Sequence, residues 1–252
     1  MFALPNMLTS LKNHPFGIEA FFDYSVVLTF AFPKEELSSA IPECLRLDTF
    51  DDKWAFLAVA LVQTKELRPK GFPRFLGNNF FLIGYRIFVR YMNNAGKNLR
   101  GLYILKSQTD SKTMEYLGNI FTHYNYETID LRQTKTQHEL KISSVKANFS
   151  LHAEKGDEGI RLPDHSPFAD WKEARRFAGP LPFTFTYDPS IKQVLIVEGK
   201  RENWVPQPLK VISYHMPSVN SLVLSTQILA NAFIINNIPY QWKKGKIEHW
   251  NA

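Results

Sequence analysis

The sequence predicts an α+β protein dominated by antiparallel β-sheet. Runs rich in Val, Ile, Thr, Phe and Tyr recur along its 252 residues and are bounded by Pro, Gly and polar breaks, as β-strands are. Two short segments carry helix-start signals. Because 44% of the residues are hydrophobic and 14% are aromatic, we expect a substantial core in a closed or strongly curved sheet. No Gly/Ser-rich or like-charged linker divides the chain, which predicts a single domain over residues 1–252.

The elements follow from local patterns in order along the chain. Residues 24–32 are dense in Val, Leu, Thr and Phe, which is typical of a strand. A short helix is expected next, because Pro33 suits its first position and apolar residues recur from Leu37 with i, i+3, i+4 spacing before Pro42. Further on, strands are expected at 54–61, 80–91, 102–105, 128–134, 139–147, 148–152, 183–187 and 194–198, a helix at 111–121, and either a strand pair or a helix at 221–235.

Charge and cysteine content restrict the partners and the compartment. The net charge of +6 comes from 30 basic and 24 acidic residues that are scattered along the chain, without a nucleic-acid-binding motif, so no nucleic-acid partner is expected. The N-terminal residues lack a signal-peptide pattern, and no apolar run approaches the roughly 18 residues of a membrane helix. The single cysteine, Cys44, excludes an intrachain disulfide and fits a reducing compartment. We therefore expect a cytoplasmic protein without a membrane segment.

No cofactor signature is present. The seven histidines show neither helical i, i+4 pairs nor Cys/His pairing, which are the usual spacings of a metal site. The 12 glycines are isolated and form no phosphate-binding loop. We expect neither a metal nor a nucleotide cofactor.

Arg86 lies inside an apolar run. Residues 80–91 read as a buried strand, where a charge is costly unless it is paired. Two interpretations stay open: Arg86 binds an anionic ligand, or it is an outward-facing or internally paired structural residue. In a regular strand Leu82, Gly84 and Arg86 share one face, and the small Gly84 leaves room for a ligand. The candidate ligand-binding residues are Arg86, Gly84, Leu82 and the adjacent Tyr85.

Two lysines are candidate nucleophiles. Lys106 follows the strand predicted at 102–105, from whose end it could project into a cavity, whereas a lysine at a strand end is more often solvated. Lys112 lies at the start of a predicted helix, where exposure is the default.

Residues 197–204 combine charged side chains with an aromatic one at a predicted hairpin end. Lys200, Arg201 and Trp204 either cover the mouth of a pocket or cap a turn. The sequence leaves both interpretations open.

Three parts of the chain resemble one superfamily. Residues 30–48, FAFPKEELSSAIPECLRLD, are similar to the opening segment of the acetoacetate decarboxylase superfamily. Residues 220–232 are similar to its closing segment, with Gln227 in place of a histidine and Asn231 in place of an aspartate. Between them, the stretches RPKGFP and YRIFVR resemble the signature of an uncharacterised branch, domain of unknown function 2071. The resemblance implies a cone-like antiparallel β-barrel with a few short helices, a ligand-sized internal cavity and assembly into a homo-oligomer.

The chain differs from the decarboxylating members of that superfamily at the catalytic residues. In those members, a lysine beside a second lysine forms a Schiff base with a keto acid, because the neighbouring charge and a dry pocket lower its pKa. The matching region here offers only Lys106 and Lys112, which are separate. The family carboxylate falls on Leu82, and the family arginine near the first strand falls close to Asp23. These losses argue against decarboxylation.

The sequence therefore favours a barrel whose cavity binds a small organic anion or an apolar molecule, with Arg86 as the surviving carboxylate clamp. The alternative is a Schiff-base lyase that acts on a small keto acid through Lys106 or Lys112. A third hypothesis is a non-catalytic interaction protein whose barrel is filled by its own Phe and Tyr side chains.

Overall fold

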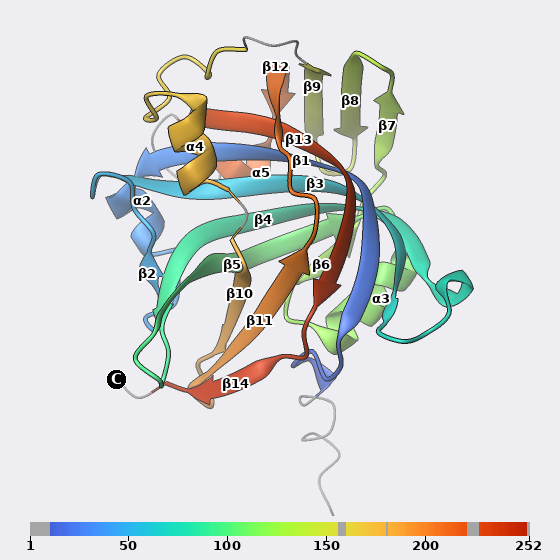
Figure 1. Ribbon diagram of the computed structural model, residues 1–252, viewed down its shortest axis with the longest axis vertical. Helices are drawn as coiled ribbons and strands as arrows, with labels where there is room; N and C mark the ends of the chain where they lie inside the picture. Colours follow the sequence, from blue (N-terminus) through green and yellow to red (C-terminus); the bar gives the residue numbers. More distant parts are fainter. Residues whose placement is uncertain (1–10, 156–159, 180, 221–226, 251–252) are drawn as a thin grey trace, which may run out of the picture.

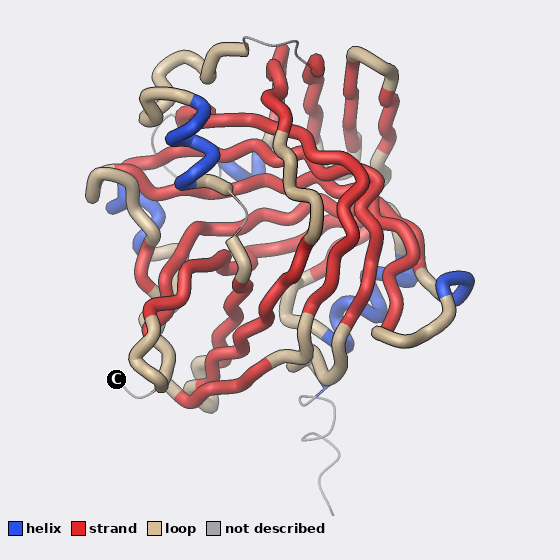
Figure 2. Tube along the Cα trace, viewed as in Figure 1, coloured by secondary structure: helices blue, strands red, loops and turns tan. Residues whose placement is uncertain are grey.

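The computed structural model describes residues 11–155, 160–179, 181–220 and 227–250 (Figure 1). Strands make up most of this part of the chain, and the helices are short (Figure 2). The predicted α+β class with a mainly antiparallel sheet is confirmed. The beginning of the segment expected at 221–235 lies outside the described residues, and its remainder is a strand. None of the described helices is long and apolar enough to cross a membrane.

The bounds of the elements are as follows. The first strands are β1 (Ile18–Pro33), β2 (Arg46–Leu47), β3 (Trp54–Pro69), β4 (Asn78–Met92), β5 (Asn98–Thr109), β6 (Tyr126–Thr128) and β7 (Arg132–Lys135). The later strands are β8 (Glu139–Ser144), β9 (Phe149–Lys155), β10 (Phe183–Asp188), β11 (Gln193–Arg201), β12 (Gln207–His215), β13 (Ile228–Trp242) and β14 (Lys246–His249). The helices are α2 (Lys34–Ser38), α3 (Lys112–Phe121), α4 (Trp171–Phe177) and α5 (Pro217–Asn220), with a 3-10 turn η1 (Arg74–Leu76).

Seven of these strands close into a ring. Their order is β11–β10–β5–β4–β3–β1–β13, and β13 pairs back onto β11 where residues 199–201 lie opposite 240–242. Neighbours in the ring are antiparallel except for β10 beside β5. Figure 1 shows these strands wrapping around a common interior. Closure gives each of the seven strands a partner on both sides, so the ring has no open edge.

The long strands of the ring bury both faces. On β1, Val26 and Leu28 point outward into a core shared with the layer β12–β9–β8–β7, whereas Ser25 and Val27 point into the ring. The same alternation holds for β3 and β4. Burial on both faces explains why the sequence of these strands reads as nearly continuous apolar runs.

The strand expected at 128–134 is divided into β6 and β7. Between them Asp130 accepts hydrogen bonds from the Ser144 hydroxyl at 2.6 Å and from the Lys146 amide at 2.9 Å, and these bonds lower the pKa of its carboxyl group. Asp130 therefore anchors a turn rather than extending a strand. The sequence patterns also did not predict β2, β12, β14 or α4. Most side chains of β12 are partly or fully exposed, so it lacks an apolar period, and α4 is marked only by its N-cap, Asp170.

Candidate functional site

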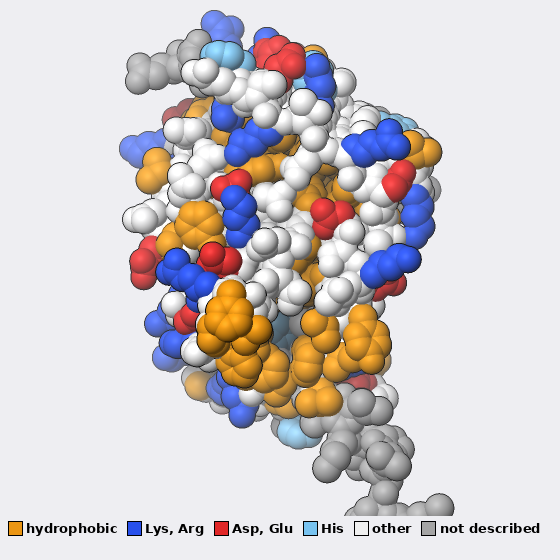
Figure 3. All heavy atoms as spheres, turned by 90° about the vertical axis from the view of Figure 1, so that its right-hand side faces the viewer, with side chains coloured by type: hydrophobic (Ala, Val, Ile, Leu, Met, Phe, Trp, Pro, Cys, Tyr) orange, Lys and Arg blue, Asp and Glu red, His pale blue; other side chains and the backbone are white. Residues whose placement is uncertain are grey.

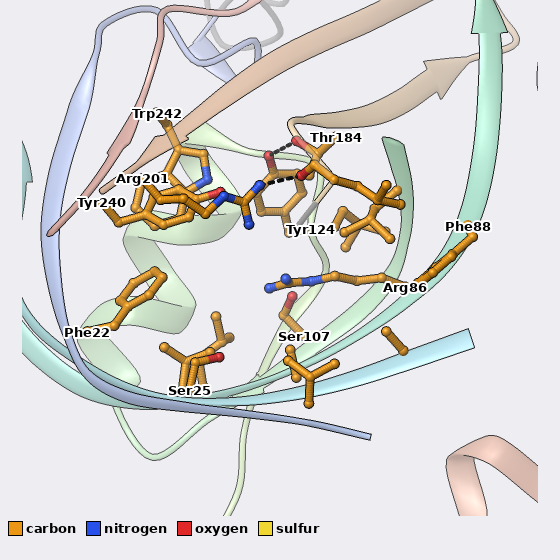
Figure 4. Close-up of a pocket in the computed structure, with 18 of the residues that line it drawn as sticks. Phe22, Ser25, Arg86, Phe88, Ser107, Tyr124, Thr184, Arg201, Tyr240 and Trp242 are labelled. Carbon is orange, nitrogen blue, oxygen red and sulfur yellow. Dashed lines mark hydrogen bonds between the residues drawn. The ribbon is translucent and has the colours of Figure 1, made fainter. Parts of the chain in front are cut away.

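The ring encloses a cavity of about 100 Å³, to which all seven strands contribute side chains (Figure 4). Most of its described lining residues are apolar or aromatic. The charged ones are two arginines, Arg86 on β4 and Arg201 on β11, and no carboxylate lines the cavity in the described part of the chain. The cavity therefore carries positive charge inside a largely apolar wall.

The position of Arg86 follows from the alternation of β4. Leu82, Arg86 and Phe88 all line the cavity, as residues on one face of a strand should. A Cβ atom on Gly84 would lie 2.9 Å from both Nε and Nη2 of Arg86, so the guanidinium group folds back over the bare glycine. The Nε of Arg86 is buried and has no hydrogen-bond partner among the described residues. A buried donor without a partner is costly, which marks this atom as free to bind a ligand.

Arg201 reaches the same cavity from the point where the ring closes. Its Nη2 donates a hydrogen bond to the Leu181 carbonyl at 2.6 Å. Its guanidinium carbon lies 4.8 Å from the centre of the Trp204 ring and 5.5 Å from that of Tyr240. Burial lowers the pKa of Arg201, Tyr240 opposes this shift, and the charge of Arg86 adds to it. Arg201 is thus held in place by neutral groups that do not cancel its charge.

Neutral hydroxyl groups complete the polar part of the wall. The Tyr124 hydroxyl lies 3.1 Å from the Thr184 hydroxyl, and burial raises the pKa of Tyr124 to about 12, against smaller opposing effects of Thr184 and Arg86. Ser107, which pairs with Gly84 across β4 and β5, points toward Arg86 in Figure 4. These hydroxyls stay protonated near neutral pH and can donate to an anion held by the arginines.

The arrangement fits an anion. Two like charges in a partly desolvated space repel each other, and a carboxylate between them would relieve that repulsion. The planar guanidinium fork matches the two oxygens of a carboxylate in a bidentate pair.

The structure separates the sequence-predicted residues by strand face. Leu82 and Arg86 line the cavity, and Gly84 lies beneath the Arg86 guanidinium. The space left by Gly84 is thus occupied by Arg86 itself rather than by open volume. Tyr85 points to the opposite face, where its hydroxyl donates to Gln108 Oε1 at 3.1 Å within the outer core.

Neither candidate nucleophile lines the cavity. The β4–β5 pairing shifts register between Tyr85 and Arg86, and Lys106 lies opposite Tyr85. The Lys106 ammonium group consequently sits 5.1 Å from the centre of the Tyr85 ring, on the outer side of the ring of strands. Lys112 is exposed at the start of α3.

Several cavity residues have no strong signal in the sequence. Within 197–204, Arg201 and Trp204 line the cavity, whereas Lys200 is exposed and is not among the lining residues. Tyr124 and Thr184 come from segments far from Arg86 in the chain, and ring closure brings them together. The alternation of β11 could have suggested a face for Arg201, but not which elements that face meets.

Comparison with known proteins identifies the family. The family model of DUF2071, described as an uncharacterized conserved protein, matches residues 22–232. The chain belongs to this family. No curated protein shows a significant match to the chain.

Solved structures show the same fold at low sequence identity. Acetoacetate decarboxylase from Legionella pneumophila is similar with a TM-score of 0.57 and 11% identity, covering 91% of this chain and 87% of that one. The enduracididine biosynthesis enzyme MppR with HEPES buffer bound gives a TM-score of 0.56 and 9% identity over 98% of this chain and 94% of that one. The same enzyme complexed with pyruvate gives a TM-score of 0.52 and 10% identity, covering 91% of this chain and 90% of that one. The expected acetoacetate-decarboxylase-like fold is therefore confirmed.

Proposed function

We propose that this protein binds a small carboxylate inside the ring of strands, and that Arg86 and Arg201 are the charged residues that hold it. The observation that carries the proposal is the pair of arginines that face one cavity. Among the described residues, no carboxylate lines this cavity and Arg86 Nε has no hydrogen-bond partner. Unpaired buried charge is expensive, so a counter-ion at this place stabilises the folded protein.

The size of the cavity restricts the ligand. At about 100 Å³ it is smaller than the roughly 150 Å³ engineered cavity that holds benzene, which favours a short acid over a large cofactor. The MppR enzyme, which has the same fold, is complexed with pyruvate in one structure, so this fold is able to hold a small keto acid. A short carboxylate of this kind is the ligand class we propose.

The alternative of Schiff-base chemistry has less support. It requires an amine at the cavity, and no lysine is among the described residues that line it. Lys106 lies against Tyr85 on the outer face, and Lys112 is exposed. The proposed role is therefore binding of the acid without covalent attachment.

Calorimetric titration tests the proposal. The wild-type protein is titrated with pyruvate, acetoacetate and butyrate, and with butyramide as an uncharged comparison. Arg86→Met keeps much of the side-chain length and removes the charge; Arg132→Met removes an exposed arginine on β7 and serves as the matched control.

We expect at least one of the acids to bind to the wild type and butyramide not to bind. Arg86→Met should lower the affinity for the acid by at least about tenfold, because a charge-assisted hydrogen-bonded pair contributes roughly 1.5–3 kcal/mol. Arg132→Met should bind as the wild type does. Equal binding by the wild type and Arg86→Met would refute the proposed site.

A further inference from the structure

A second cavity lies beside the first, between α3 and the ring. Its volume is about 160 Å³, and apolar side chains dominate its lining, among them Phe80, Met114, Leu117 and Phe121. The two cavities share one wall: Leu82, Tyr124, Tyr126 and Trp242 line both of them. A single layer of side chains therefore separates the cationic cavity from the apolar one.

The second cavity offers no free charge. Arg68 is the cation among its described lining residues, and it forms an ion pair with Glu19 at 3.2 Å. His14 also lines the cavity, and burial, followed by the neighbouring His123, lowers its pKa to about 4, so its ring is neutral near pH 7. The Nε2 of His14 is buried without a hydrogen-bond partner among the described residues. The cavity thus favours an uncharged, mainly apolar group.

The shape of the surface agrees with this polarity. α3 and the connection between β3 and β4 lie on the right of Figure 1, and this side faces the viewer in Figure 3. Hydrophobic side chains gather around a hollow on this face. The connection carries the exposed side chains of Phe72, Phe75 and Leu76. An apolar ligand would meet a matching surface here.

We propose that the two cavities form one binding site for an amphipathic acid, whose carboxylate pairs with Arg86 and Arg201 and whose apolar ring or tail occupies the cavity beside α3. This inference rests on the proposed function and adds the ligand class. The connection requires the shared wall to part, and Leu82 is its one aliphatic member, so its side chain can rotate without breaking a hydrogen bond. The apolar cavity is close in volume to the roughly 150 Å³ that accommodates benzene, which favours an aryl group.

A pair of acids that differ only in a phenyl group tests the inference. Butyrate and 4-phenylbutyrate are titrated calorimetrically into the wild-type protein and into two variants of α3. Leu117→Trp fills the apolar cavity from a half-buried lining position, and Tyr116→Trp adds a similar ring at the neighbouring exposed position, where the side chain is not among those lining either cavity. Circular dichroism and thermal unfolding verify that both variants are folded.

We expect 4-phenylbutyrate to bind the wild type at least about tenfold more tightly than butyrate, because burying a phenyl group is worth at least that factor. Leu117→Trp should remove this advantage and leave butyrate binding intact, whereas Tyr116→Trp should change neither. If Leu117→Trp does not fold, Met114→Phe, which enlarges another lining residue, replaces it with the same expectation.

The other outcomes overturn the inference in distinguishable ways. If butyrate binds through Arg86 but the phenyl group adds nothing, the apolar cavity is not part of the site and the proposed function stands. If the phenyl advantage survives both cavity-filling substitutions, the tail lies elsewhere. If neither acid binds, the inference fails, and the titrations with pyruvate and acetoacetate decide separately whether the proposed function stands.

Discussion

The guanidinium groups of Arg86 and Arg201 enter the same cavity from strands that are not neighbours in the ring. Burial lowers the pKa of Arg201, and the charge of Arg86 adds a smaller contribution in the same direction. Neither group meets a carboxylate among the described residues that line the cavity. Two partly buried cations without a counter-ion reduce the stability of the empty protein.

Arg86→Met should stabilise the empty protein while it weakens acid binding. The substitution eliminates a partly buried charge whose Nε has no hydrogen-bond partner in the described part of the chain, so we expect the free energy of unfolding to rise by about 1 kcal/mol. Urea denaturation in a buffer without carboxylates or phosphate measures the change. Arg132→Met, at an exposed position, should stay within about 0.5 kcal/mol of the wild type. A loss of stability in Arg86→Met would mean that Arg86 has a structural role.

Arg201→Met should have the opposite effect on stability. It removes the 2.6 Å hydrogen bond to the Leu181 carbonyl and the contacts with the Trp204 and Tyr240 rings. We expect a loss of about 1–3 kcal/mol in the free energy of unfolding, together with weaker acid binding. The same urea series measures it. A variant that unfolds like the wild type would show that these contacts contribute little.

Gly84→Ala should displace the Arg86 guanidinium. The new Cβ would lie 2.9 Å from Nε and Nη2, and the flexible end of Arg86 must move away. We expect the affinity for the acid to fall roughly tenfold, because the guanidinium group is displaced. The free energy of unfolding should fall by less than about 1 kcal/mol, because a flexible side chain moves and the backbone does not. Gly17→Ala, whose Cβ would approach nothing closer than 3.4 Å, is the control. Unchanged affinity in Gly84→Ala would contradict this placement of Arg86.

His14 should make stability depend on pH. Its pKa is lowered from 6.5 to about 4 in the folded protein, chiefly by burial, so between these values the unfolded chain binds a proton that the folded chain does not. Stability should therefore decrease as the pH falls from about 6.5 toward 4, by up to ~3 kcal/mol for this group. The urea midpoint should depend less on pH in His14→Gln than in the wild type. His165→Gln, at an exposed position, should keep the pH dependence of the wild type. Parallel profiles for wild type and His14→Gln would exclude His14 as the source.

Borohydride reduction in the presence of pyruvate should leave the protein unmodified. No lysine is among the described residues that line the cavity, so no imine is available for reduction there. Intact-mass analysis and peptide mapping provide the measurement. A stoichiometric adduct on Lys106 or Lys112 would establish a reactive amine and favour the lyase hypothesis instead.

The sequence predicted the local features of the site. Apolar runs identify the strands, and the two-residue period of a strand places Leu82, Gly84 and Arg86 on one face. The cost of a charge inside an apolar run singled out Arg86. These inferences need only neighbouring residues, which is why they are available without a structure.

Tertiary structure decided everything that depends on which strands meet. The register shift between Tyr85 and Arg86 sets Lys106 beside Tyr85, outside the ring, although the sequence leaves its direction open. The pairing of β11 with β13 closes the ring and brings Arg201 to Arg86 across more than a hundred residues of chain. Alternation is a local property of the backbone, whereas closure and register arise from long-range pairing that minimises unpaired backbone and exposed apolar surface over the whole chain. For that reason, the sequence by itself singled out Arg86 and the residues that share its strand face, and only the fold decided that this face lines a cavity and that Arg201 enters the same cavity.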